Sequence, residues 1–184
     1  MIEIEPYCTH QPLLLGAISL TNGRGGAIVE LGSGYYSTPL LKMLCGTNER
    51  RLVTLDNDAD WLRQTTTPAL AMDESQNIMA HTLRHDVHHI ANWNDLHRYG
   101  ADLLCDVAFI DLAPADLRGM AIHVMSRWAT IIVIHDTETE QRHNYPGVAE
   151  AIATFPYLVT DRRRGPWTTV VSNDPVILSL PSFL

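Results

Sequence analysis

Short apolar runs alternate with amphipathic segments along most of the chain. Continuous apolar runs predict strands that are buried on both faces, and amphipathic segments predict the helices between them. The expected strands are residues 27–31, 51–56, 79–86, 106–111 and 130–136, followed by a pair at 157–163 and 167–173. The expected helices are residues 12–21, 59–66, 114–128 and 147–155, with a further helix opening at residue 37.

Strands that alternate with helices indicate an α/β fold with a doubly wound, mostly parallel sheet and helices on both faces. The last two strands flank the tripeptide Arg-Gly-Pro, which predicts an antiparallel C-terminal hairpin. The sheet is therefore expected to have seven strands. A chain of 184 residues suits a single domain, residues 1–184, with a substantial core.

The composition narrows the class of partner. Hydrophobic residues make up 46% of the chain and charged residues 18%, which is typical of a globular protein. A net charge of -8 argues against binding to nucleic acid, because such proteins usually carry a basic face. We expect neither a membrane span nor a signal peptide, and three scattered cysteines fit a reduced, cytoplasmic protein.

Acidic residues stand at the ends of four predicted strands, namely Asp56, Asp86, Asp111 and Asp136. In an open α/β sheet the ligand crevice lies outside the carboxyl ends of the strands. One such acid could simply cap a helix or face solvent. Four of them beside a glycine loop favour a binding site at this edge.

The glycine loop lies between the first predicted strand and the second predicted helix. Gly32 and Gly34 permit a tight turn, and Ser37 or Thr38 can cap the helix that follows. Asp56 comes about 20 residues later, a spacing suited to binding ribose hydroxyls. Glu30 would repel a pyrophosphate but suits an ammonium group. A ligand with an ammonium group, a ribose and an adenine is S-adenosylmethionine.

At this point the sequence resembles the class I S-adenosylmethionine-dependent methyltransferases. The segments "VELGSGYYST" and "VTLDND" resemble their first two motifs, and "LRHDVHHI", "DVAFIDLAP", "IIVIHDTE" and "GPWTTVVS" resemble later ones. The resemblance implies a cofactor-binding core at residues 23–175 and an N-terminal helical lid at residues 1–22, with His10 and Gln11 at its helix start. The cofactor-binding residues that it implies are Glu30, Gly32, Gly34, Tyr36, Ser37, Thr38, Asp56, Asn57, Asp86, Val87 and Asp111, with Asp86 towards the adenine amine and Val87 against the ring.

The chemistry of methyl transfer requires a positioned nucleophile and a group that removes its proton. His135, followed by Asp136, is a candidate base near neutral pH. The resemblance to catechol-type O-methyltransferases implies a second version, in which Asp111 and Asp136 hold Mg²⁺. Thr137 stands where those enzymes have an asparagine. The predicted catalytic residues are His135, Asp136 and Asp111.

The leading hypothesis is methyl transfer to an oxygen of a small molecule. One alternative is an NAD-dependent oxidoreductase, which would have to tolerate Glu30 near the pyrophosphate. Another is a catalytically inactive methyltransferase-like interaction scaffold. The sequence does not name the acceptor. It leaves a homodimer open, because the apolar N-terminal helix could pack across one.

Overall fold

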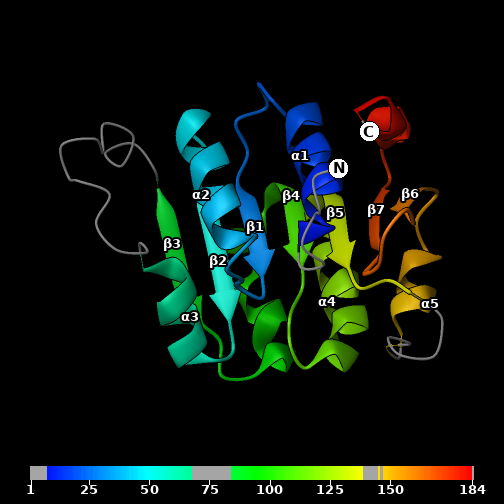
Figure 1. Ribbon diagram of the computed structural model, residues 1–184. Helices are drawn as coiled ribbons and strands as arrows, with labels where there is room; N and C mark the ends of the chain where they lie inside the picture. The colour runs from blue at the N-terminus through cyan, green and yellow to red at the C-terminus, as the bar shows by residue number, and fades with distance from the viewer. Residues whose placement is uncertain (1–7, 68–83, 139–144, 146, 184) are drawn as a thin grey trace.

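A computed structural model describes residues 8–67, 84–138, 145 and 147–183. Seven strands of these residues form one sheet in the order β3-β2-β1-β4-β5-β7-β6, side by side in Figure 1. The strands are β1 (Ile28–Leu31), β2 (Leu52–Asp56), β3 (His85–His89), β4 (Cys105–Ile110), β5 (Ala129–His135), β6 (Tyr157–Asp161) and β7 (Thr168–Ser172). The predicted α/β class and the seven-stranded sheet are confirmed.

Strand direction is also as predicted. The pairs β1–β2, β1–β4, β2–β3 and β4–β5 are parallel, whereas β7 is antiparallel to both of its neighbours, β5 and β6. The dinucleotide-binding order 3-2-1-4-5-6 has no reversed strand inserted between its fifth and sixth strands. Because β1, β2, β4 and β5 are parallel, their carboxyl ends meet at one edge of the sheet.

Helices cover both faces of the sheet (Figure 1). The helices are α1 (Gln11–Leu20), α2 (Thr38–Thr47), α3 (Ala59–Thr66), α4 (Arg118–Met125) and α5 (Val148–Ile152), with 3₁₀ segments η3 (Trp93–Leu103), η4 (Ala115–Leu117) and η5 (Pro175–Phe183). One core lies between the sheet and α1, α2 and η5. The other lies between the sheet and η3, α4 and α5. This arrangement accounts for the fully buried patterns of β1, β2 and β7.

The N-terminal helix differs from the prediction of a lid. Leu13, Leu14 and Ala17 of α1 are fully buried, and α1 packs against β4, β5, β7 and η5. The described part of residues 1–22 thus belongs to the core. The apolar surface on which the expectation of a homodimer rested is covered within the chain, and the dimer itself stays a prediction. No helix among the described residues is long and apolar enough to cross a membrane.

The third strand also differs from its predicted bounds. Residues 79–83 of the predicted strand lie outside the described residues, and β3 begins at His85 and ends at His89. β3 is an edge strand and carries polar residues on both faces. The first buried apolar residue of this segment is Ile90, directly after the strand. A polar edge strand gives no apolar run, so its position could not be predicted from hydrophobicity alone.

Candidate functional site

Three of the four predicted strand-end acids lie at the carboxyl edge of the sheet. Asp56 is the last residue of β2, Asp111 directly follows β4, and Asp136 directly follows β5. Asp86 does not lie there, because it is the second residue of β3 and pairs with Val53, the second residue of β2, near the amino ends of both strands. Its carboxylate instead accepts a hydrogen bond of 2.6 Å from Arg51 Nε.

The predicted adenine contacts of Asp86 and Val87 do not fit these positions within β3, and they stay predictions. Asp86 forms a surface ion pair with Arg51, and that hydrogen bond lowers the pKa of Asp86. Val87 lies in the middle of β3, opposite Thr54. β3 ends at His89, so the carboxyl edge of this strand is formed by His89 and the residues that follow it.

The glycine loop brings β1 close to β4. Gly32 has a φ of +91°, and a Cβ there would collide with the backbone of Asp111 and lie 2.6 Å from Leu112 Cα. Only glycine fits a left-handed conformation with backbone so near. The N–H of Gly32 donates to the carbonyl of Leu55 at 2.9 Å, so the turn stays tied to β2.

Asp56 holds this loop in place. Its Oδ2 accepts hydrogen bonds from the backbone N–H of Ser33 at 2.7 Å and from the Ser33 hydroxyl at 2.9 Å. Its Oδ1 accepts a third from the N–H of Asp58 at 2.9 Å. From the other side, Trp61 Nε1 donates to the Ser33 carbonyl at 2.6 Å and the Thr65 hydroxyl donates to Ser33 Oγ at 2.8 Å. The loop is thus fixed by β2 and α3 together.

Glu30 lies beneath the loop and not beside it. The residue has no exposed surface, and its carboxylate accepts hydrogen bonds from the hydroxyls of Ser37 at 2.7 Å, Thr38 at 3.0 Å and Thr54 at 2.9 Å. Burial raises the pKa of Glu30 to about 7, although these three hydrogen bonds oppose the shift. The predicted direct contact with an ammonium group is wrong for this geometry, and Glu30 supports the loop and the start of α2.

The N-terminus of α2 also differs from the prediction of a side-chain cap. Ser37 is the N-cap of α2 by position, but its side chain makes no capping hydrogen bond because the hydroxyl donates to Glu30. Thr38 Oγ1 instead accepts the N–H of Gly34 at 3.0 Å. Both hydroxyls therefore connect the helix to the glycine loop and to β1. The sequence predicted a helix cap by Ser37 or Thr38, whereas in the structure their hydroxyls bond to Glu30 and Gly34.

Tyr36 and Asn57 both lie at the carboxyl edge. The side chain of Tyr36 is 40% exposed, and its carbonyl accepts a hydrogen bond of 3.2 Å from Gln11 Nε2. Asn57 follows Asp56, and its Oδ1 accepts from Trp93 Nε1 at 3.0 Å. Each could contact a ligand above the loop, and these assignments stay predictions.

A buried arginine joins the acids that follow β4 and β5. Arg118, the first residue of α4, is 5% exposed. Its Nη2 donates to Asp111 Oδ1 at 2.7 Å, and its Nη1 donates to Asp136 Oδ2 at 2.8 Å. Nη1 also donates to the carbonyl of His135 at 2.9 Å, and Nε to that of Leu112 at 3.1 Å.

His135 completes this cluster as a cation. Thr9 donates its only hydroxyl proton to the carbonyl of Pro166 at 2.7 Å, so Thr9 Oγ1 must accept from His135 Nε2 at 3.0 Å. The other ring nitrogen, Nδ1, lies 3.2 Å from Asp111 Oδ2 and must also carry a proton to bond to a carboxylate. Burial alone would lower the pKa of His135, but the hydrogen bond to Asp111 and the charges of both acids raise it.

The role of catalytic base therefore does not fit His135. Both of its ring nitrogens donate, and the residue is 4% exposed. The strand-end position was predicted correctly, but the partners keep the imidazole protonated. Asp136 is more accessible than His135, with 16% against 6% of the side chain exposed, and Asp111 is more accessible still, with 29%.

A second histidine lies against the first. His10 is 2% exposed, and its ring centroid is 4.9 Å from that of Phe109 and 5.0 Å from that of His135. Burial and the neighbouring His135 lower the pKa of His10 to about 4. His10 is therefore neutral where His135 is charged, because burial disfavours its charged form and, of the two histidines, only His135 has a hydrogen bond to Asp111.

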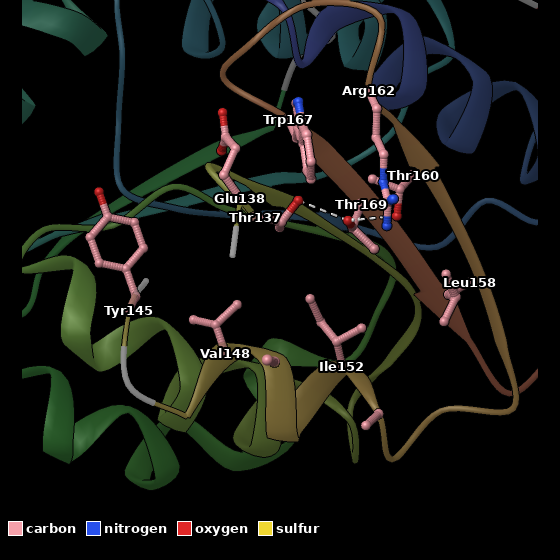
Figure 2. Close-up of a pocket in the computed structure, with 12 residues that line it drawn as sticks. Thr137, Glu138, Tyr145, Val148, Ile152, Leu158, Thr160, Arg162, Trp167 and Thr169 are labelled. Carbon is pink, nitrogen blue, oxygen red and sulfur yellow. Dashed lines mark hydrogen bonds between the residues drawn. The ribbon is translucent and has the colours of Figure 1, made fainter. Parts of the chain in front are cut away.

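A cavity of about 240 Å³ lies between α5 and the β6–β7 hairpin (Figure 2). Its floor is α5, and its far wall is the β6–β7 hairpin, with Trp167 and Arg162 at the rim. It adjoins the cluster through Thr137, the residue after Asp136, and Tyr145. The Tyr145 ring lies 5.0 Å from Arg118 Cζ. The remaining lining residues are Glu138, Val148, Ala149, Ile152, Ala153, Leu158, Thr160 and Thr169.

Sequence reasoning missed Arg118, Thr9 and Ser33. Ser33 was hidden between two glycines, and Thr9 acts across 126 residues, so neither gives a local signal. Arg118 did leave one. A cation in the first turn of a helix opposes the helix dipole, and such a placement calls for a specific acidic partner.

Solved structures share this fold, although no model of a protein family and no curated protein sequence matches the chain. Human methyltransferase-like protein 13, in complex with S-adenosylhomocysteine, is 17% identical with a TM-score of 0.62 over 96% of this chain and 90% of that chain. An O-methyltransferase from Bacillus cereus, also in complex with S-adenosylhomocysteine, is 18% identical with a TM-score of 0.60 over 92% and 82%. The O-methyltransferase TomG from Streptomyces achromogenes, in complex with S-adenosylmethionine, is 15% identical with a TM-score of 0.59 over 93% and 82%. The chain therefore has the Rossmann-like fold of the S-adenosylmethionine-dependent methyltransferases.

Proposed function

We propose that this protein is an S-adenosylmethionine-dependent methyltransferase that acts on an oxygen of a small molecule. The observation that carries the proposal is the tie between the glycine turn at Gly32 and the strand-end carboxylate of Asp56, made through Ser33. A carboxylate can accept about four hydrogen bonds, and Asp56 accepts three from the protein. Its Oδ1 retains capacity for a ribose hydroxyl.

The choice of oxygen as acceptor draws on the solved structures of similar fold. Two of those reported above are described as O-methyltransferases. The cofactor supplies an electrophilic methyl group, so the chain has only to bind both reactants and take up a proton. We assign the proton to Asp136, because it directly precedes Thr137 in the wall of the cavity, and an orienting role to His135 and Arg118.

We assign the acceptor to the cavity beside Asp136. Its volume of about 240 Å³ lies below the usual range for drug-sized ligands, which favours a small acceptor. Apolar side chains of α5 and the ring of Trp167 suit a flat apolar body, and the polar side chains near Thr137 suit a hydroxyl. The other expectations, namely no nucleic-acid or membrane partner and a cytoplasmic location, stay predictions.

The first test is calorimetric titration with S-adenosylhomocysteine, with NAD as the control ligand. We expect saturable binding of the nucleoside, and at least a tenfold weaker affinity in Asp56→Ala, equivalent to about 1.4 kcal/mol. The matched control is Asp102→Ala, which removes an exposed acid from η3. Unchanged affinity in folded Asp56→Ala, or binding of NAD alone, would overturn the proposed pocket.

The acceptor assignment has its own test. Methyl transfer from labelled S-adenosylmethionine is followed across a panel of small phenols, alcohols and carboxylic acids. For an acceptor that reacts, Trp167→Ala should raise the KM for the acceptor and leave the affinity for S-adenosylhomocysteine unchanged. An unchanged KM would place the acceptor elsewhere.

A further inference from the structure

The two acids that a metal-dependent O-methyltransferase would use already share one cation. Arg118 bonds to Asp111 through Nη2 at 2.7 Å and to Asp136 through Nη1 at 2.8 Å. Two backbone carbonyls accept from Nη1 and Nε, so four of the five guanidinium N–H groups have partners. The Tyr145 ring lies against the guanidinium at 5.0 Å.

The geometry of the acids themselves would suit a metal ion. One ligand atom each from Asp111, His135 and Asp136 lies within 4.8 Å of the others. Mg²⁺ requires oxygen ligands at about 2.0–2.1 Å in an octahedral arrangement. Asp111 Oδ1 and Asp136 Oδ2 point instead at guanidinium nitrogens, and His135 Nδ1 lies 3.2 Å from Asp111 Oδ2.

Charge leads to the same conclusion. Arg118 and His135 face the two carboxylates, so a divalent ion added among them would leave an excess of positive charge. Excess charge at a site this buried carries a large desolvation cost. The ion would fit only if Arg118 left the cluster. The residues present therefore do not fit the predicted Mg²⁺.

We propose that Arg118 is the resident cation of this site, that it takes the place of a divalent metal between Asp111 and Asp136, and that its removal uncovers a divalent-cation site. Arg118 is thus a positioning residue. It fixes both carboxylates at the edge where the acceptor is assigned, and a planar fork with fixed donors does this with defined angles. The inference extends the proposed function, but its test measures metal binding and requires no turnover.

The experiment is a titration of chelator-treated protein with Mn²⁺, followed by electron paramagnetic resonance, together with thermal unfolding in millimolar MgCl₂ or MnCl₂. We expect the parent protein to show no saturable Mn²⁺ binding that depends on Asp136, and no shift in Tm. Arg118→Ala should bind Mn²⁺ and gain several degrees in Tm with the ion. Both effects should disappear in Arg118→Ala/Asp136→Asn.

Two control variants test whether Mn²⁺ binding follows from the loss of the cation at position 118 and not from the loss of any positive charge. Arg127→Ala removes an exposed arginine just beyond the end of α4 and should behave as the parent protein. Arg118→Lys keeps a cation between the acids and should not bind Mn²⁺.

Two outcomes would overturn the inference. One is Mn²⁺ binding by the parent protein that Asp136→Asn abolishes, and the other is a folded Arg118→Ala that binds no Mn²⁺. If Arg118→Ala does not fold, the comparison of the parent protein with Asp136→Asn decides alone. Failure of S-adenosylhomocysteine to bind would count against the proposed function and leave this result unaffected.

Discussion

The two halves of the carboxyl edge stabilise their acids by opposite means. Under α2, Glu30 is surrounded by hydroxyl groups, and burial raises its pKa to about 7. After β4, Asp111 faces the cations Arg118 and His135. Burial opposes the effect there, yet the hydrogen bond from His135 and both positive charges hold the pKa of Asp111 below its usual value.

The difference shows that burial alone does not decide how an acid ionises. Hydroxyl groups can bond to a carboxylic acid and to a carboxylate alike, so they leave the desolvation penalty of the charge largely in place. A guanidinium adds a countercharge and fixes the ionised form. The half assigned to the cofactor is therefore held by neutral hydrogen bonds, and the half assigned to the acceptor by ion pairs.

Gly32 is the point at which the two halves touch, and its substitution should have the largest effect. Gly32→Ala puts a methyl group into the backbone of Asp111 and a side chain on a φ of +91°. We expect a loss of roughly 3–5 kcal/mol of unfolding free energy, from backbone strain and overpacking together. Urea denaturation measures it.

The neighbouring glycine is the matched control for that variant. A Cβ on Gly34 would meet only Ser37 Oγ, at 3.1 Å, and its φ is not positive. Gly34→Ala should cost much less than Gly32→Ala. Equal losses in the two variants would contradict the close approach between β1 and β4.

Amidation of the ion-paired acid should destabilise the protein. Asp111→Asn leaves Arg118 with one carboxylate, that of Asp136, and takes the nearer carboxylate from His135, whose Nδ1 also lies 3.6 Å from Asp136 Oδ1. We expect a loss of roughly 2–3 kcal/mol near neutral pH, less than the full cost of breaking a buried pair because one partner remains. Asp116→Asn, at an exposed acid of η4, is the control.

The loss in Asp111→Asn should depend on pH in a defined way. Asp111 has a lowered folded pKa, so its contribution is present above the unfolded value of 3.8 and is lost as the pH falls through the folded value. His135 has a raised folded pKa, so its contribution is complete below 6.5 and is lost as the pH rises through the folded value. The difference between parent and variant should therefore be largest between these limits. A difference that grew on acidification to below the Asp111 value would contradict the ion-pair assignment.

The same chemical change at Glu30 should have the opposite sign. A raised folded pKa means that the contribution of Glu30 is complete below 4.5 and is lost as the pH rises through about 7. The parent protein should lose on the order of 3 kcal/mol across that range. Glu30→Gln removes this dependence and should be more stable than the parent by about 1–2 kcal/mol near pH 8. The gain is smaller than the loss in the parent protein because the amide N–H groups must also find acceptors.

Stability curves from acidic to alkaline pH test this prediction. Glu150→Gln, an exposed acid on α5, controls for the loss of one surface charge. A parallel pH dependence of Glu30→Gln and the parent protein would show that Glu30 does not titrate in the predicted range.

Most of the fold could be predicted because its signals are local. The strands β1, β4 and β5 are continuous apolar runs, and sheet order follows once the motifs around Gly32 and Asp56 suggest the fold. The third strand was predicted at residues 79–86, and the bounds of β3 differ because an edge strand with the sequence HDVHH carries no hydrophobic period. The packing of α1 escaped prediction because an apolar helix can cover its own core or a partner equally well.

The site could be predicted in position but only partly in function. The strand ends correctly placed Asp56, Asp111, His135 and Asp136 at one edge. Their protonation states depend on contacts distant in sequence. Thr9 fixes the proton on His135 from 126 residues away, and the guanidinium that binds the acids comes from a helix that is mostly apolar. No spacing along the chain encodes such contacts.

The smallest effect is expected at Asp86, the acid that the sequence placed wrongly. Asp86→Asn breaks an ion pair with Arg51 whose two side chains are 28% and 30% exposed, so it should cost less than about 1 kcal/mol. The affinity for S-adenosylhomocysteine should stay within about twofold of the parent value, a difference below 0.5 kcal/mol. Calorimetric titration of Asp86→Asn and Asp56→Ala under the same conditions compares the effect of each acid on this affinity. A tenfold loss in Asp86→Asn would return this residue to the adenine site and show that β3 moves when the ligand binds, whereas an unchanged affinity confines the cofactor site to the acids that lie at the carboxyl edge.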